Sequence, residues 1–341
     1  MKQISKLAFV LAALSLLLSP LLVLAKSVHQ QEDQSFQNQP QKFYQSSGHN
    51  YQNAGGSSVG AGKELEKKVF GFHPYWMGDA WKNYDFDLLS TIAYFGADLN
   101  GNGSIGEKHD WPVTDLITTA HQNDVKVVLV AKNFSTSGIR DLLSSASNRS
   151  NAINNLVTEV KNASADGVNI DFEYVPEDQR NNFTTFVRDL TNTFHQEIPG
   201  SEVSLDAPAV DWNSSWDISA LAAATDVLMI MGYDYHYAGG SQAGPVAPLE
   251  SGNQWSNYNV TNTINSYVAT AGGNKHKLLL GVPYYGYDWP TSSQSIPSGT
   301  TGRASAVRFN TLQENIDTGS RHRLWNNDSH TPYYLYSSHQ V

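Results

Sequence analysis

The sequence predicts an α/β protein: a (β/α)8 TIM barrel, truncated before its eighth strand, with a small α+β insertion after the seventh. The first observation behind this prediction is that short, β-branched runs alternate with segments of helical spacing, which is typical of parallel βαβ units. The second is their number, because seven expected strands in about 215 residues suit a barrel. Periodicity alone also allows an open sheet.

The expected strands cover 69–72, 91–95, 125–130, 167–172, 202–205, 226–231 and 277–282, with helices near 113–123, 149–162, 178–197 and 260–271. Residues 286–338 break this alternation and are interpreted as an inserted subdomain. No eighth strand precedes Val341. Because an open barrel edge exposes unpaired backbone groups, we expect a fragment of a longer chain.

The N-terminal residues predict export. Lys2 and Lys6 precede an apolar run that ends at Ala25, so residues 1–25 are interpreted as a signal peptide; an uncleaved membrane anchor is the alternative. Residues 26–66 are rich in Gln, Ser and Gly and are expected to form a flexible linker to a catalytic barrel over 67–341. We expect a secreted protein without stable membrane insertion after cleavage.

The composition predicts a packed globular protein. Hydrophobic residues make up 40% and charged residues 16% of the chain, and there is no cysteine, so stability must come from core packing. A net charge of −10 argues against nucleic acid as a partner. Eight Trp and seventeen Tyr suit sugar rings and protein cores equally well. We expect a monomer.

The stretch DGVNIDFEY (166–174) places carboxylates where a strand is expected to be buried. Side chains alternate along a strand, so Asn169, Asp171 and Glu173 share one face, and Glu173 lies at the C-terminal end, where barrel active sites form. Mutual repulsion and burial raise a carboxyl pKa and can keep Glu173 protonated as a general acid. A structural acid cluster and a metal site are the alternatives. Only His236 could join a metal site, and no metal or other cofactor is expected.

Four motifs in order resemble glycoside hydrolase family 18, the chitinase-like enzymes. DGVNIDFE is similar to the family's DGxDxDxE strand, and MGYDYH (231–236) is similar to its MxYD strand. FGFHPYW (70–76) and GVPYYGYDW (281–289) resemble the first and seventh strands. The resemblance covers residues 68–341 and implies a barrel of that family.

The resemblance implies retaining, substrate-assisted hydrolysis, in which the substrate's 2-acetamido group attacks the anomeric carbon. Glu173 would be the general acid and then the base, and Asp171 would orient the acetamido group. Tyr233 would hydrogen-bond that group, and Asp234 would hold the sugar near the cleavage point. The expected substrate-binding residues are Asp234, Asn169, Met231, Tyr75, Trp212 and Tyr285.

Two features depart from the family pattern. Asn169 replaces the usual Asp, and we expect its amide to hydrogen-bond Asp171 and to shift the pH profile. This variant resembles enzymes of spore cortex and peptidoglycan. The floor Trp of the eighth strand is absent. The remaining candidates for stacking are Tyr75, Trp76, Trp212, Tyr284, Tyr285 and Trp289, each of which could equally be a packing residue.

The leading hypothesis is a secreted glycosidase that cuts chitin or other glycans containing N-acetylglucosamine. A peptidoglycan-cleaving N-acetylglucosaminidase and a catalytically inactive chitin-binding lectin are the alternatives. Since inactive relatives usually replace the acid and Glu173 is intact, the enzyme is favoured.

Overall fold

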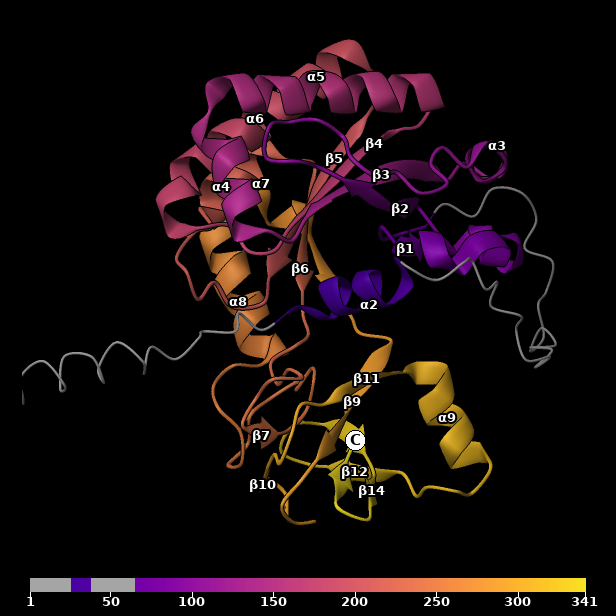
Figure 1. Cartoon of the computed structure of the whole chain (residues 1–341), viewed down its shortest axis with the longest axis vertical. Coiled ribbons are helices and arrows are strands. Elements are labelled where there is room, and N and C mark those ends of the chain that lie inside the picture. The colour runs from indigo at the N-terminus through magenta and orange to yellow at the C-terminus, as the bar shows by residue number, and fades with distance from the viewer. Residues whose placement is uncertain (1–25, 38–64) are drawn as a thin grey trace, which may run out of the picture.

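The centre of the molecule is a seven-stranded parallel sheet, seen in a computed structural model that describes residues 26–37 and 65–341 (Figure 1). Its order is β1-β2-β3-β4-β5-β6-β8, so each strand lies beside its successor. The strands are β1 (Phe70–Pro74), β2 (Thr91–Asp98), β3 (Lys126–Asn133), β4 (Gly167–Phe172), β5 (Glu202–Pro208), β6 (Val227–Met231) and β8 (Leu278–Gly281). All seven predicted strands are confirmed. Within the described ranges, β1 and β8 are the two edges of this sheet.

Helices follow the strands and cover the outside of the sheet (Figure 1). They are α3 (Thr114–Gln122), α4 (Thr136–Ser144), α5 (Ala146–Ala163), α6 (Arg180–Glu197), α7 (Ile218–Ala224) and α8 (Val260–Ala271), with the short 3-10 helices η1 (Tyr75–Asn83), η2 (Phe86–Leu88), η3 (Glu177–Gln179) and η4 (Gly272–Lys277). Helices α4 and α7 were not predicted, because each spans only about two turns and shows too little periodicity to stand out.

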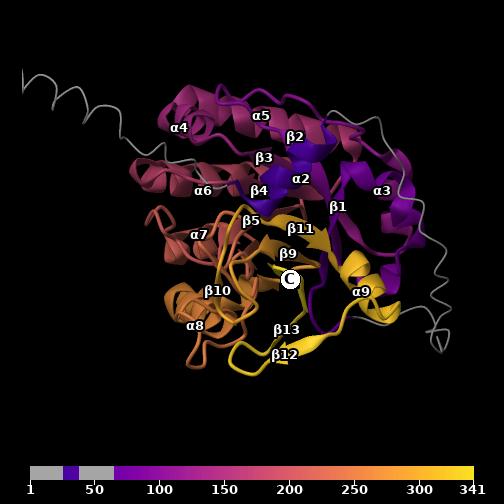
Figure 2. The ribbon, with the colours of Figure 1, turned by 60° about the horizontal axis from the view of Figure 1, so that its bottom comes forward.

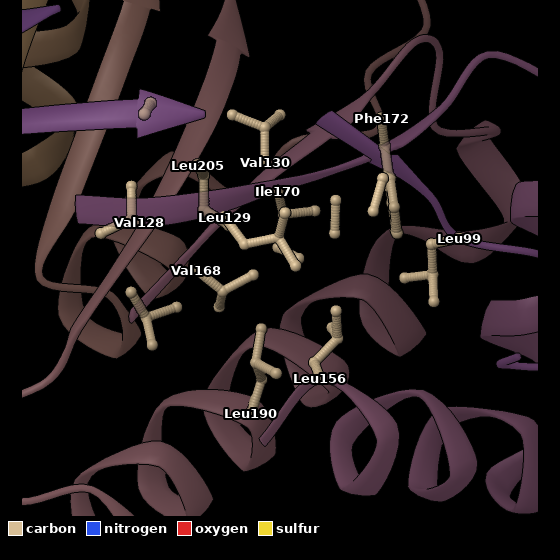
Figure 3. Packing of buried hydrophobic residues seen from close by; sticks show 14 of the residues in the cluster. Leu99, Val128, Leu129, Val130, Leu156, Val168, Ile170, Phe172, Leu190 and Leu205 are labelled. Atoms are coloured by element: carbon tan, nitrogen blue, oxygen red, sulfur yellow. The ribbon is translucent and has the colours of Figure 1, made fainter. Parts of the chain in front are cut away.

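The outer face of β4 is packed against these helices. Val168, Ile170 and Phe172 point from the strand toward Leu156 of α5 and Leu190 of α6, and all five side chains are buried (Figure 3). Burying an aliphatic or aromatic side chain of this size contributes about 1.5–3 kcal/mol. The polar residues that alternate with these three are thereby directed to the other face of the strand.

A separate α+β subdomain is formed mainly by residues after β8, together with part of the segment between β6 and α8. Its main sheet is antiparallel, in the order β11-β9-β15-β14, and α9 packs beside it. Buried residues that include Tyr287 and Trp289 form its own small core. Its main elements are β9 (Tyr285–Pro290), β11 (Ser305–Arg308), α9 (Phe309–Asp317), β14 (Leu335–Tyr336) and β15 (His339–Gln340). Two small sheets of two strands each complete it. In one, β7 (Gln242–Ala243) pairs with β10 (Ser298–Gly299), and in the other, β12 (Leu324–Asn326) pairs with β13 (Thr331–Tyr333).

One helix, α2 (Val28–Phe36), lies where a flexible linker was predicted, so that prediction is wrong for these residues. The Ser27 hydroxyl caps its first turn by accepting a hydrogen bond from the Gln30 N–H at 3.0 Å. The two views place α2 between the barrel and the subdomain (Figures 1 and 2). The low apolar content of this segment predicted a flexible linker, but α2 is held in place largely by charged and polar partners.

The predicted signal peptide, 1–25, and the rest of the predicted linker, 38–64, lie outside the described residues. Within the described part of the chain, no helix combines the length and the apolar character needed to cross a bilayer.

Candidate active site

The site is built around two acids at the C-terminal end of β4. Asp171 is completely buried, and Glu173, the first residue after the strand, is 5% exposed. Both lie on the face opposite Phe172 and the helices. Their nearest carboxylate oxygens lie within 4.8 Å of each other. Ionisation of both carboxyl groups is energetically unfavourable at this separation in a buried site.

The pKa of Glu173 is raised, first by burial and then by the neighbouring charge of Asp171. The carboxyl group of Asp206, on β5, is also buried, and burial followed by Asp171 raises its pKa well above the usual range. Both shifts favour retention of a proton in this cluster as the pH rises. Glu173 is the member at the mouth of the barrel, where it can deliver that proton to a bound molecule.

Asn169 is fully buried. Its amide was expected to hydrogen-bond Asp171, but it bonds to other partners. Its Nδ2 donates instead to Ser204 Oγ and Asp206 Oδ1 on β5, each at 3.0 Å. The expectation was wrong because same-face neighbours along one strand are about 7 Å apart, whereas the next strand lies about 4.8 Å away. The sequence analysis missed Asp206. Its alternation with Ser204 across the end of the predicted strand was the available signal.

Three predicted residues at and after the end of β6 face the acids across the barrel. Met231 and Asp234 line the same cleft as Glu173, as does Tyr233. The Asp234 carboxylate accepts hydrogen bonds from the hydroxyls of Tyr285 and Tyr287, the latter at 3.1 Å. Burial raises the pKa of Asp234 and these two bonds oppose the rise. Tyr287 was not predicted, although it alternates with Tyr285 on the same strand.

His29, from α2, lies between the two walls of the site. Its Nδ1 is 3.0 Å from Glu173 Oε1 and 3.5 Å from Asp171 Oδ2, and its Nε2 is 3.2 Å from the Tyr233 hydroxyl. Burial lowers the pKa of His29, but Tyr233 and the two carboxylates outweigh it and raise that pKa well above 6.5. His29 was not predicted as a site residue, because it belongs to the segment that was expected to be a linker.

A second buried charge pair joins α2 to the barrel wall. Lys132, at the end of β3, is 2% exposed, and its Nζ lies 3.1 Å from Asp33 Oδ2 and also contacts Asp98. Tyr75 is buried here as well. Its ring stacks on His109 and its hydroxyl is 3.3 Å from Asp33 Oδ1, so it is not open to solvent beside α2.

A cleft of about 510 Å3 extends from Glu173 along the C-terminal ends of β5 and β6. Residues 26–29 form part of its lining, as does Trp212, which is 70% exposed and in edge contact with Tyr258. Of the predicted site residues, the cleft brings together Glu173, Tyr233, Asp234, Met231 and Trp212. Asp171, Asn169, Tyr75 and Tyr285 do not line it, although Tyr285 bonds to Asp234, which does.

Within the described ranges, His29, Asp171 and Glu173 form the one group of side chains placed to hold a metal ion. An ion there would have to replace the hydrogen bond between His29 and Glu173. His236, which the sequence suggested as a possible metal ligand, does not belong to this group. Its Nδ1 is hydrogen-bonded to the carbonyl of Pro245 at 2.9 Å.

Comparisons with known proteins agree with the geometry. The family model described as Glycosyl hydrolases family 18 matches residues 68–341. YdhD of Bacillus subtilis (strain 168), described as a candidate sporulation-specific glycosylase, is 28% identical over 263 residues, which is 74% of this chain and 57% of YdhD. Human di-N-acetylchitobiase is 28% identical over 291 residues, covering 76% of this chain and 67% of that protein.

The fold also matches a solved structure. The chitinase of Trichuris suis superposes with a TM-score of 0.72 at 22% identity, and the match covers 80% of this chain and 84% of that one. The chain spans little more than half the length of YdhD, so it corresponds to a part of that relative.

Proposed function

Because the chain belongs to glycosyl hydrolase family 18, we propose that it is a secreted retaining glycosidase that cuts β-1,4 bonds in chitin or other glycans containing N-acetylglucosamine. One observation carries the proposal: Glu173, with its raised pKa, lies beside Asp171 and opposite Tyr233 in a cleft. Export is proposed from the N-terminal 25 residues alone.

The geometry suits a two-step reaction. The Glu173 carboxyl group donates its proton to the glycosidic oxygen as the bond from that oxygen to the anomeric carbon breaks. The carbonyl oxygen of the substrate's own acetamido group forms a bond to the same carbon, while Asp171 and Tyr233 hold that group in place. Glu173, now ionised, takes a proton from water, which opens the cyclic intermediate with overall retention.

Peptidoglycan is the second candidate substrate. The supporting observations are the likeness to YdhD, a candidate sporulation-specific glycosylase, and Asn169 in place of the family's usual Asp. Peptidoglycan contains N-acetylglucosamine in β-1,4 linkage, so the same acid and the same acetamido chemistry would serve. Release of reducing ends from purified spore cortex and from chitin, compared at equal glycan mass, separates the two substrates.

The test of the chemistry is hydrolysis of a soluble N-acetylglucosamine oligosaccharide, with the product anomers followed by NMR. We expect the β-anomer first. Glu173→Gln should lower turnover by about 10²–10⁴-fold, since it removes the proton donor, and Glu177→Gln, an exposed acid on η3, is the matched control. A Glu173→Gln protein that keeps more than about a tenth of the activity would contradict the assigned role. If the wild-type chain and variants with an undocked α2 all bind the sugar but none of them hydrolyses it, the protein is a lectin.

A further inference from the structure

We propose that residues 26–37 are an intramolecular inhibitor: α2 occupies the substrate cleft of this same chain and must leave before a glycan can reach Glu173. The inference rests on the proposed function, because it treats the cleft as the place where the glycan binds. Its basis is a set of contacts between α2 and the groups that would perform the chemistry.

The first contact engages the reacting groups themselves. The imidazole of His29 joins Glu173 to Tyr233 through its two ring nitrogens, at 3.0 and 3.2 Å. These are the positions that a glycosidic oxygen and an acetamido oxygen would take in the proposed reaction. A sugar ring and this imidazole cannot be there together. The backbone of Val28 also lies close enough to Asp234, the group expected to hold the sugar, to lower the pKa of that carboxyl.

The second contact is the buried pair of Asp33 and Lys132, whose side chains are 2% and 1% exposed. A buried charge pair requires close partners, and breaking it by removal of one partner is strongly unfavourable. Lys132 on β3 is paired in register with Asp171 on β4, so both side chains lie on the same face of the sheet, and Asp98 is its other partner. α2 therefore sets an imidazole against the acids of the site and a carboxylate against the buried lysine on the neighbouring strand.

The third contact is at the other end of the helix. Phe36 stacks on Trp76, with ring centroids 5.0 Å apart and planes 9° apart. The guanidinium of Arg308, on β11 of the subdomain, lies over Phe36 and 3.7 Å from Glu32. The pair with Glu32 is partly exposed and adds little. Both ends of α2 are thus held, one by the barrel acids and the other between Trp76 and the subdomain.

An occupied cleft has a defined kinetic signature. If the cleft is open in only a fraction of molecules, the apparent affinity for substrate falls by that fraction, whereas saturating substrate displaces the helix and restores full turnover. The structure therefore predicts a raised KM with an unchanged kcat. If α2 had only a structural role, its release would not lower KM while leaving kcat unchanged.

The test compares the full chain with His29→Ala combined with Asp33→Lys. The second change sets two cations against each other at the buried pair, and neither residue belongs to the proposed catalytic set. We expect KM for an N-acetylglucosamine oligosaccharide to fall at least about tenfold with kcat unchanged. Phe36→Ala, which removes only the stack on Trp76, should lower KM by a smaller factor. Ser35→Ala is the matched control, since its exposed hydroxyl bonds only to the Gln31 carbonyl of its own helix.

Amide hydrogen exchange of residues 28–36 in the same proteins measures docking without any need for catalysis. We expect protection in the wild-type chain and loss of protection in the double variant or on addition of oligosaccharide. Unprotected amides in the wild type, or an unchanged KM after their release, would overturn the inference. If the helix is protected in the wild type and released in the variant but no protein turns over the sugar, the proposed function fails and inhibition fails with it, while docking stands.

Discussion

At the scale of single residues, the site depends on how charge is shared among buried groups. Glu173 must be protonated to donate to a leaving oxygen, and its pKa is raised first by burial and then by Asp171. Because the acid form is the active one, kcat/KM should fall as pH rises through this raised pKa. His29 acts in the opposite direction on Glu173 when α2 is docked, so the pKa of the free acid is measured best without that contact.

Replacing Asp171 by Asn removes the negative neighbour that raises the pKa of Glu173. In the His29→Ala, Asp33→Lys background, the alkaline limb of the kcat/KM profile should therefore move to lower pH, in addition to any loss of rate. The measurement is a pH series with a soluble oligosaccharide. Asp178→Asn, at an exposed acid paired with Arg140, should leave the limb in place. An unmoved limb in Asp171→Asn would mean that burial alone sets the pKa of Glu173.

At the scale of elements, β4 has two faces with different tasks. Its apolar residues lock the strand against α5 and α6, and this packing sets the position of the acids on the opposite face. Phe172 is 2% exposed and stacks on Phe186 of α6, with centroids 6.0 Å apart. The core behind the strand is thus part of the machinery that positions Glu173.

Truncating Phe172 to Ala should lower the free energy of unfolding by about 3–5 kcal/mol, because it leaves a cavity in a closed core. It should also reduce kcat, since Glu173 is the next residue along the chain. Urea denaturation and steady-state kinetics measure the two effects. Leu88→Ala, at a side chain that is 59% exposed, provides the comparison and should change neither. A loss of stability with full activity would show that the acids do not depend on this packing.

At the scale of the whole molecule, the cleft combines parts that lie far apart in the sequence. Its lining comes from the residues just after β4, from the end of β6 and the segment after it, from the loop after β5, and from residues 26–29. The subdomain adds Tyr285 and Tyr287, which hold Asp234, and Arg308, which lies over Phe36. The part of the cleft next to Trp212 stays open while α2 is docked.

Trp212 should therefore be the first surface that a glycan meets. Trp212→Ala should raise KM roughly two- to tenfold with little change in kcat, since an aromatic stacking contact contributes about 0.5–1.5 kcal/mol. Trp325→Ala is the matched control, because Trp325 is also exposed but lies on β12 of the subdomain and does not line this cleft. An equal effect of both substitutions would show that Trp212 has no particular place in binding.

The parallel strands, the polar face of β4 and the order of the four motifs could all be predicted from the amino-acid sequence. Each is encoded locally, by alternation or spacing along one segment, so no distant partner had to be known. Three further features depend on how the chain folds: the bond from Asn169 to Asp206, the buried pair of Lys132 with Asp33, and the insertion of His29 between Glu173 and Tyr233. These join residues separated by 37, 99 and 144 positions or more. A polar helix held by distant charges carries no apolar pattern that would reveal it in the sequence.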